Sequence, residues 1–180
     1  MKERLSWMIL IYKVPAEPST LRVRAWRKIK DMGALYLQQS VAIYPKINHL
    51  AEEFTGLVEE IKTSGGEALL FEVINLSGEG EKALISKFNE QRDLEYRELM
   101  DKCEDFFDEI KKETERQNFT FAELEENDEE LEKLSRWYEK IKERDFFEAS
   151  MRQKAEEMLA ICREMFFEFA QTIYKKEGTM

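Results

Sequence analysis

The sequence contains little proline, glycine, cysteine or histidine, and each shortage excludes a class of protein. Three prolines and seven glycines among 180 residues argue against a low-complexity tail or a flexible linker. The two cysteines, Cys103 and Cys162, lie far apart without metal-type spacing, so we expect reduced thiols in a cytoplasmic protein. The single histidine, His49, does not suit a histidine-based metal centre. We expect no cofactor.

Long apolar runs are also missing. The apolar segment at residues 7–12 is much shorter than the ~18 residues that cross a bilayer. It is followed by Lys13 and has no cleavage site of small residues, so it does not read as a secretory signal. We expect no membrane partner. The sequence also lacks a phosphate-binding loop and a nucleophile elbow, which argues against the enzyme classes that use them.

What the sequence does contain is a strong charge asymmetry. The first fifty residues hold nine Lys or Arg and three Asp or Glu, a net charge of +6. The other 130 residues hold 19 basic and 35 acidic residues, a net charge of −16. The positive charge is concentrated in residues 21–30, Leu-Arg-Val-Arg-Ala-Trp-Arg-Lys-Ile-Lys. An acidic protein with one compact cationic surface is expected to use that surface on an anion, such as DNA, phosphate or another oxyanion.

The order of apolar patterns predicts an α+β fold. Residues 5–14 and 67–76 are typical of strands, and residues 34–45 predict two short strands or one bent strand. Helices are predicted from Pro18 or Ser19 to Met32, and over 48–63. The first of these helices has an apolar stripe at spacings of four, four and three: Leu21, Ala25, Ile29 and Met32. The resulting β-α-β-β-α-β order is the ferredoxin-like split pattern.

The rest of the sequence predicts helices only. Their expected ranges are 80–116, 122–142 and 147–175, and their apolar stripes can close an antiparallel helical bundle. We therefore predict two subdomains: a ferredoxin-like one with the basic helix, residues 1–77, and an acidic all-α one, residues 78–180. Small CRISPR-associated nucleases share the ferredoxin-like topology and use an Asp near the end of the first strand. This chain has Lys-Val-Pro at that place, so we do not expect a metal-dependent nuclease. Because the other catalytic motifs are missing as well, we predict a protein that is not an enzyme.

Several segments resemble the N-terminal region of ChrB, a family of bacterial chromate-resistance regulators. The segments are WMILIYKVPAEPS at 7–19, RVRAWRK at 22–28, GALYLQQSV at 33–41, GGEA at 65–68, RDLEY at 92–96 and RDFF at 144–147. The resemblance implies a cytoplasmic protein of the chromate response, tied to transcription regulation through DNA or an oxyanion. ChrB proteins have a further C-terminal domain beyond the matched region. The region also resembles the middle domain of PaaX-type repressors. Those proteins bind DNA through a separate winged helix, which the pattern of this sequence does not predict.

Two interpretations of the basic helix remain open. In the first, it binds DNA phosphates or a chromate-type oxyanion, since Arg offers planar paired donors to such groups and Trp26 can stack on a base. The candidate anion- or DNA-binding residues are Lys13, Arg22, Arg24, Arg27, Lys28, Lys30 and Arg92. In the second, Trp26 is core and the arginines pair with carboxylates. Arg27 can pair with Asp31 one turn on, whereas Arg24 and Lys28 have no acidic neighbour of this kind.

Two further features allow a structural and a functional interpretation. Arg92 lies on the inward-facing side of its helix with Phe88, Tyr96 and Leu99, so its charge needs a partner. That partner is either Glu95, or an acidic residue from the first subdomain, or a bound oxyanion. Cys103 and Cys162 lie on core stripes, where each is either a buried structural thiol or a redox sensor.

Together these patterns predict a non-enzymatic regulator of chromate resistance that binds DNA phosphate or an oxyanion through the basic helix. The alternative is an interaction module that forms a homodimer through its sheet edge or helical half, or that binds an acidic partner protein. The lack of a recognition motif favours phosphate contacts over reading of bases.

Overall fold

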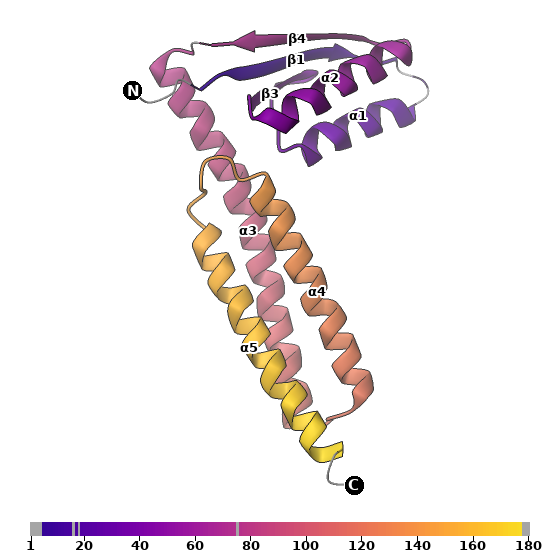
Figure 1. The fold of residues 1–180 in the computed structure, drawn as a ribbon, viewed down its shortest axis with the longest axis vertical. Helices are drawn as coiled ribbons and strands as arrows, with labels where there is room; N and C mark the ends of the chain where they lie inside the picture. Colours follow the sequence, from indigo (N-terminus) through magenta and orange to yellow (C-terminus); the bar gives the residue numbers. More distant parts are fainter. Residues whose placement is uncertain (1–4, 16, 18, 75, 178–180) are drawn as a thin grey trace. The chain divides into compact units, whose positions relative to one another are not determined.

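The structure is a computed structural model that describes residues 5–15, 17, 19–74 and 76–177. Figure 1 shows a mixed β-sheet and helix region followed by helices only, so the predicted α+β class is confirmed. The chain forms two compact units, and the boundary between them follows Phe88, inside the longest helix. None of the described helices is long and apolar enough to cross a bilayer.

The first unit is built on one antiparallel sheet with the strand order β2-β3-β1-β4. The strands are β1 (Trp7–Lys13), β2 (Leu35–Gln38), β3 (Val41–Pro45) and β4 (Glu67–Val73). This is the predicted ferredoxin-like arrangement, with two short strands joined by a turn at Gln39 and Ser40. Strands β1 and β4 are shorter than predicted. β1 is central because its run of apolar residues can be covered on both faces.

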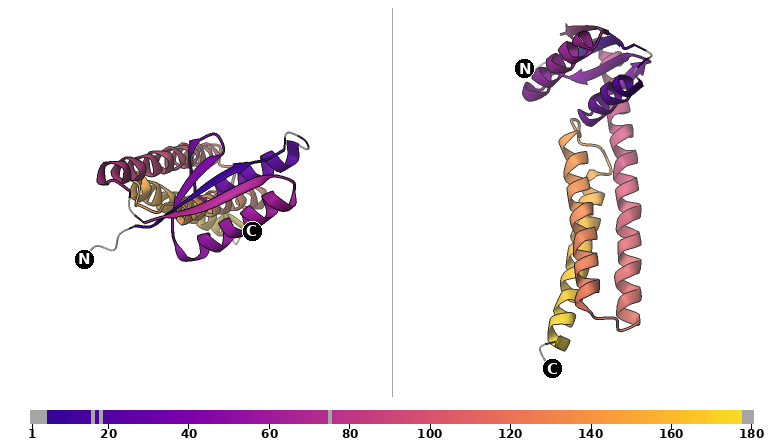
Figure 2. Two further views of the ribbon diagram at one scale, coloured as in Figure 1. Left: turned by 90° about the horizontal axis from the view of Figure 1, so that it is seen from above. Right: turned by 90° about the vertical axis from the view of Figure 1, so that its right-hand side faces the viewer.

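Two helices, α1 (Ser19–Asp31) and α2 (Asn48–Thr63), lie on one face of the sheet (Figures 1 and 2). The predicted stripe of α1 is buried, with at most 6% of any side chain exposed. After α1, Gly33 has a φ of 75°, a left-handed conformation that favours glycine and ends a helix. Pro18, one of the two predicted starts of α1, lies outside the described residues.

The opposite face of the sheet is apolar. We call it the apolar sheet face, and in register it holds Ile9, Ile11, Val41, Ile43, Leu69 and Phe71. Alternation along a strand sends every second residue to this side. Its exposed part lies on β1 and β4, where Ile11, Leu69 and Phe71 are 42%, 59% and 47% exposed. Exposed apolar side chains that adjoin one another are typical of contact surfaces.

The second unit is a bundle of α3 (Gly78–Glu115, from Asn89 on), α4 (Phe121–Glu143) and α5 (Arg152–Glu177). Apolar side chains of all three form one core, which includes Leu99, Leu134 and Leu159. The predicted start of α5 at residue 147 is wrong by five residues. The Asp145 carboxylate accepts a hydrogen bond from the Ala149 N–H, and Glu148 has a φ of 55°, so a tight turn precedes the helix.

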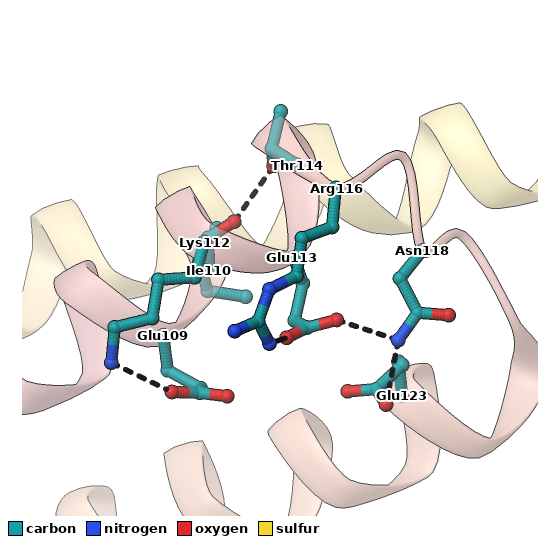
Figure 3. A network of polar contacts seen from close by, with 8 residues as sticks. All are labelled: Glu109, Ile110, Lys112, Glu113, Thr114, Arg116, Asn118 and Glu123. Atoms are coloured by element: carbon teal, nitrogen blue, oxygen red, sulfur yellow. Dashed lines mark hydrogen bonds and ion pairs between the residues drawn. The ribbon is translucent and has the colours of Figure 1, made fainter.

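A polar network closes the turn between α3 and α4 (Figure 3). The Glu113 carboxylate, which is 3% exposed, accepts hydrogen bonds from Arg116 (3.1 Å) and from the Asn118 amide (2.6 Å). The same amide donates to Glu123 at 3.0 Å. Thr120 caps α4 by accepting from the Glu123 N–H. Because a buried carboxylate needs such donors, the role of Glu113 is structural.

Candidate anion-binding cleft

A cleft of about 590 Å³ opens in the first unit, between the end of β1, the outer side of α1 and the β2–β3 turn. Its described lining consists of Tyr12, Lys13 and Val14 from β1, Arg22, Val23 and Trp26 from α1, and Gln39 and Ser40 from the turn. The cleft therefore brings together two predicted site residues, Lys13 and Arg22, with Trp26. None of these lining residues is acidic, so the cleft has a positive charge.

Among the described residues, the cations of this cleft form no ion pair with a carboxylate, although Glu67 of β4 lies directly opposite Lys13 in the register of the sheet. Lys13 and Arg22 are exposed, as is Arg27 further along α1. None of the three takes part in an ion pair or hydrogen bond of a side chain within the described part of the chain. The predicted pair of Arg27 with Asp31 is also absent among the described ion pairs. These three side chains remain available to an external anion.

Two other predicted site residues are neutralised within the fold. Glu60 of α2 pairs with Arg24 (Nε to Oε1, 2.5 Å) and with Lys28 (Nζ to Oε2, 3.1 Å). Internal pairing was therefore a correct interpretation for Arg24 and Lys28, although their partner lies on the neighbouring helix. It does not extend to the cations that line the cleft. One carboxylate thus divides the basic face of α1 into a paired part and a free part.

Trp26 is not a core residue. Its side chain is 47% exposed, because it follows the buried Ala25 and so projects about 100° away from the apolar stripe. The interpretation of Trp26 as core is wrong. The ammonium group of Lys30 lies over the indole ring, 5.4 Å from its centroid, which is a cation–π contact. Lys30 does not line the cleft, and it adds a positive charge beside it.

Local backbone contacts fix the walls of the cleft. A Cβ atom at Gly66 would lie 2.6 Å from the carbonyl oxygen of Lys13, so only glycine permits this packing against the end of β1. The Tyr12 N–H donates to the Ser40 carbonyl at 3.0 Å, which ties the turn to β1. Burial, and then the hydrogen bond between the Tyr36 and Tyr12 hydroxyls, raises the pKa of Tyr36 far above its usual value. The Tyr36 hydroxyl therefore brings no negative charge near neutral pH.

Arg92, the last predicted site residue, is part of the second unit. It is 1% exposed, and its guanidinium lies 3.1 Å from Glu95, whose other oxygen lies 3.0 Å from Arg144. Tyr96 donates to the Asp145 carboxylate at 3.2 Å. Burial lowers the pKa of Arg92, while the charge of Glu95 opposes this effect. The 3.1 Å ion pair matches the predicted pairing of Arg92 with Glu95, although none of the three guanidinium nitrogens makes a hydrogen bond to the described residues.

The remaining chemistry of the second unit does not favour an anion. The thiols of Cys103 and Cys162 are free and buried. The Cys162 thiol donates to the Cys103 backbone carbonyl at 4.0 Å. The neighbouring Cys103 side chain, together with burial, raises the pKa of Cys162. A cleft of about 610 Å³ along α3 and α4 includes six carboxylates in its lining, which repel anions. Among the described residues, no group of three or more His, Cys, Asp or Glu side chains could hold a metal ion.

Comparison with known proteins places the chain in a family. Residues 22–180 match the family described as "Protein ChrB, N-terminal". The chain belongs to this ChrB N-terminal family. One relative, Protein ChrB of Cupriavidus metallidurans (strain ATCC 43123 / DSM 2839 / NBRC 102507 / CH34), is 25% identical over 101 residues, which cover 56% of this chain and 28% of that protein. The ChrB resemblance noted in the sequence is confirmed, and the match spans less than a third of that relative's length.

Sequence reasoning missed three residues of the site. Gln39 and Ser40 fall inside the segment 34–45 that was predicted only as strand, and their polarity between two apolar stretches is the signal that could have indicated a wall of the cleft. Glu60 lies on the α2 face that meets α1, some thirty residues after the cations that it pairs. Nothing in the local sequence singles it out from the other acids of α2.

Proposed function

We propose that this chain is a non-enzymatic regulatory protein of chromate resistance that binds the phosphates of DNA. Membership of the ChrB N-terminal family supports the link to chromate resistance. The observation that carries the proposal is that Lys13, Arg22 and Arg27 are exposed without a carboxylate partner in the described part of the chain. An acidic protein has many carboxylates with which to neutralise such side chains, and among the described residues none forms an ion pair with these three.

The arrangement suits phosphate contacts more than reading of bases. Phosphate contacts position a protein on the duplex, whereas specificity needs side chains at base edges in a groove. Three free cations correspond to about three phosphates, so the logarithm of affinity should fall with the logarithm of salt with a slope of about −2.7. Binding of this size is weak and non-specific unless another domain or a second copy adds contacts.

A salt titration of duplex DNA binding tests the proposal. Affinity for a labelled 20-base-pair duplex is measured by fluorescence anisotropy between 50 and 200 mM salt. Arg27→Gln should make the slope shallower by about 0.9, the contribution of one phosphate. The matched control is Arg136→Gln on α4, which changes net charge equally but removes a cation paired with Glu132 at 2.9 Å. Absence of duplex binding at 50 mM salt, or equal slopes for both variants, contradicts the proposal.

A chromate-type oxyanion is the other ligand that the cations suit, since Arg binds phosphate and chromate through the same paired donors. A ligand that binds only the folded protein raises its melting temperature by mass action. If chromate raises the melting temperature more than sulfate and phosphate do at equal ionic strength, chromate is the ligand. Equal shifts for all three anions would leave DNA phosphate as the only supported ligand.

The second candidate function is a protein-interaction module, which the apolar sheet face favours. Ile11, Leu69 and Phe71 are neighbours across β1 and β4 and are about half exposed. A second copy of the chain could cover this face by packing sheet on sheet. Light scattering after size exclusion should then show a dimer that Phe71→Ser dissociates. A wild-type monomer at 100 μM would exclude this homodimer at that concentration.

A further inference from the structure

We propose that the cleft beside α1 binds one nucleotide with an unpaired base, the base stacked on Trp26 and the phosphate held by Lys13 and Arg22. The proposal rests on the proposed function only in sharing these two cations. It adds the aromatic ring of Trp26 and a cleft with defined walls. A protein that only contacts duplex phosphates needs neither. The same chemistry occurs in a free nucleotide and in an unpaired residue of a DNA strand, and the test separates these sources.

The first argument is the exposed face of Trp26. A tryptophan on a helix surface normally turns its apolar area toward the core, whereas this ring is 47% exposed and lines the cleft together with the 44% exposed Val23. Leaving this apolar area in water is unfavourable, and a stacked ring would cover it. Bases within a duplex have their faces covered by neighbouring pairs. A base that stacks on Trp26 must therefore be unpaired.

The second argument is the pairing of an aromatic surface with positive charge in one cleft. Lys13 comes from the end of β1 and Arg22 from α1, and both border the space that Trp26 borders. A nucleotide offers a planar base and a phosphate within one small molecule. The cleft volume, about 590 Å³, lies within the range of small-ligand sites. Inorganic phosphate or chromate alone would leave the aromatic wall without a role.

The third argument is the polar wall opposite α1. The Gln39 amide and the Ser40 hydroxyl both donate and accept hydrogen bonds, which suits the edge of a base. Ser40 has a φ of 65°, an unusual conformation for serine. The hydrogen bond from the Tyr12 N–H to its carbonyl holds the turn in place. The wall is therefore fixed before a ligand arrives, which reduces the ordering cost of binding.

The test uses the full chain and three probes: a labelled single-stranded oligo-dT, a duplex of the same length, and dTMP. Trp26→Leu keeps an apolar side chain but removes the stacking surface, and Trp26→Phe restores an aromatic ring. We expect Trp26→Leu to weaken oligo-dT binding by about 5- to 150-fold, the range of base–aromatic stacking. The salt slope should not change, because no charge is removed. Wild-type tryptophan emission should be quenched by oligo-dT, and the quenching should be lost in Trp26→Leu.

The outcomes separate this inference from the proposed function. Oligo-dT binding that is equal in wild type and Trp26→Leu, without quenching, overturns the inference even if the duplex binds normally. Quenching by dTMP that depends on Trp26, without duplex binding, supports the inference and contradicts the proposed function. Quenching by oligo-dT but not by dTMP assigns the site to a strand rather than to a free nucleotide. Equal melting temperatures of the variants would show that they are folded, and Trp26→Phe serves as the folded comparison if Trp26→Leu is not.

Discussion

Replacing Glu60 by Gln should make the protein bind DNA more tightly, although the residue itself contacts no ligand. Its carboxylate holds Arg24 and Lys28 at 2.5 and 3.1 Å, and the amide of Gln cannot neutralise them. Both cations would become available beside those that are already free. If about three phosphates are contacted before the change and about five after it, the salt slope steepens from about −2.7 to about −4.5.

The size of this effect is measurable. A slope steeper by about 1.8 means that Glu60→Gln loses about twelvefold more affinity than wild type between 50 and 200 mM salt. Its gain over wild type is therefore largest at low salt. The cost in stability should be small, since pairs at this level of exposure contribute about 0.2–1 kcal/mol each. Fluorescence anisotropy with a labelled duplex measures the slopes, and urea unfolding measures the stability.

The matched control is Glu59→Gln, one residue earlier. It changes net charge equally, but Glu59 is 68% exposed and its oxygen lies 3.9 Å from Lys62 on the same helix. If Glu59→Gln and Glu60→Gln have the same affinity and salt slope, a general charge effect explains the data. The reasoning about released cations would then be refuted.

Three further predictions concern stability and thiol reactivity. Gly66→Ala should lower the free energy of unfolding by about 1–3 kcal/mol, because its Cβ would meet the backbone of β1. Gly56→Ala, which has open space around it, should instead raise the free energy of unfolding by about 1 kcal/mol. Urea unfolding that finds Gly66→Ala more stable than Gly56→Ala refutes this prediction. Glu113→Gln should cost about 1–3 kcal/mol because a buried acceptor of two hydrogen bonds is altered, and an unchanged urea midpoint would contradict it. Cys103 and Cys162 should react with DTNB only after unfolding, because both thiols are buried; rapid reaction of the native protein would show otherwise.

Local patterns were sufficient to predict most of the fold. The stripe from Leu21 to Met32 and the glycine after it define α1, because helix periodicity and helix termination depend on nearby residues. The start of α5 was not predictable in this way. There, carboxylates of Asp93 and Asp145 accept hydrogen bonds from the backbone of the turn, and Asp93 is more than fifty residues away in sequence.

The candidate site was predictable only in part, for a related reason. That Arg22 and Trp26 lie off the buried stripe follows from the helix itself. The helix alone does not determine which cations stay unpaired, because Glu60 reaches Arg24 and Lys28 only through the packing of α2 against α1. The free part of a charged surface depends on long-range contacts, so composition indicates an anion site without delimiting it.

The apolar sheet face has a consequence for handling the protein. At pH 7 the formal net charge of −10 keeps molecules apart by repulsion, although Leu69 and Phe71 are exposed. Near the isoelectric point, about pH 4.9, that repulsion vanishes and the exposed side chains can adhere to one another. Solubility should therefore pass through a minimum in mildly acidic buffer, and Leu69→Lys should make that minimum shallower.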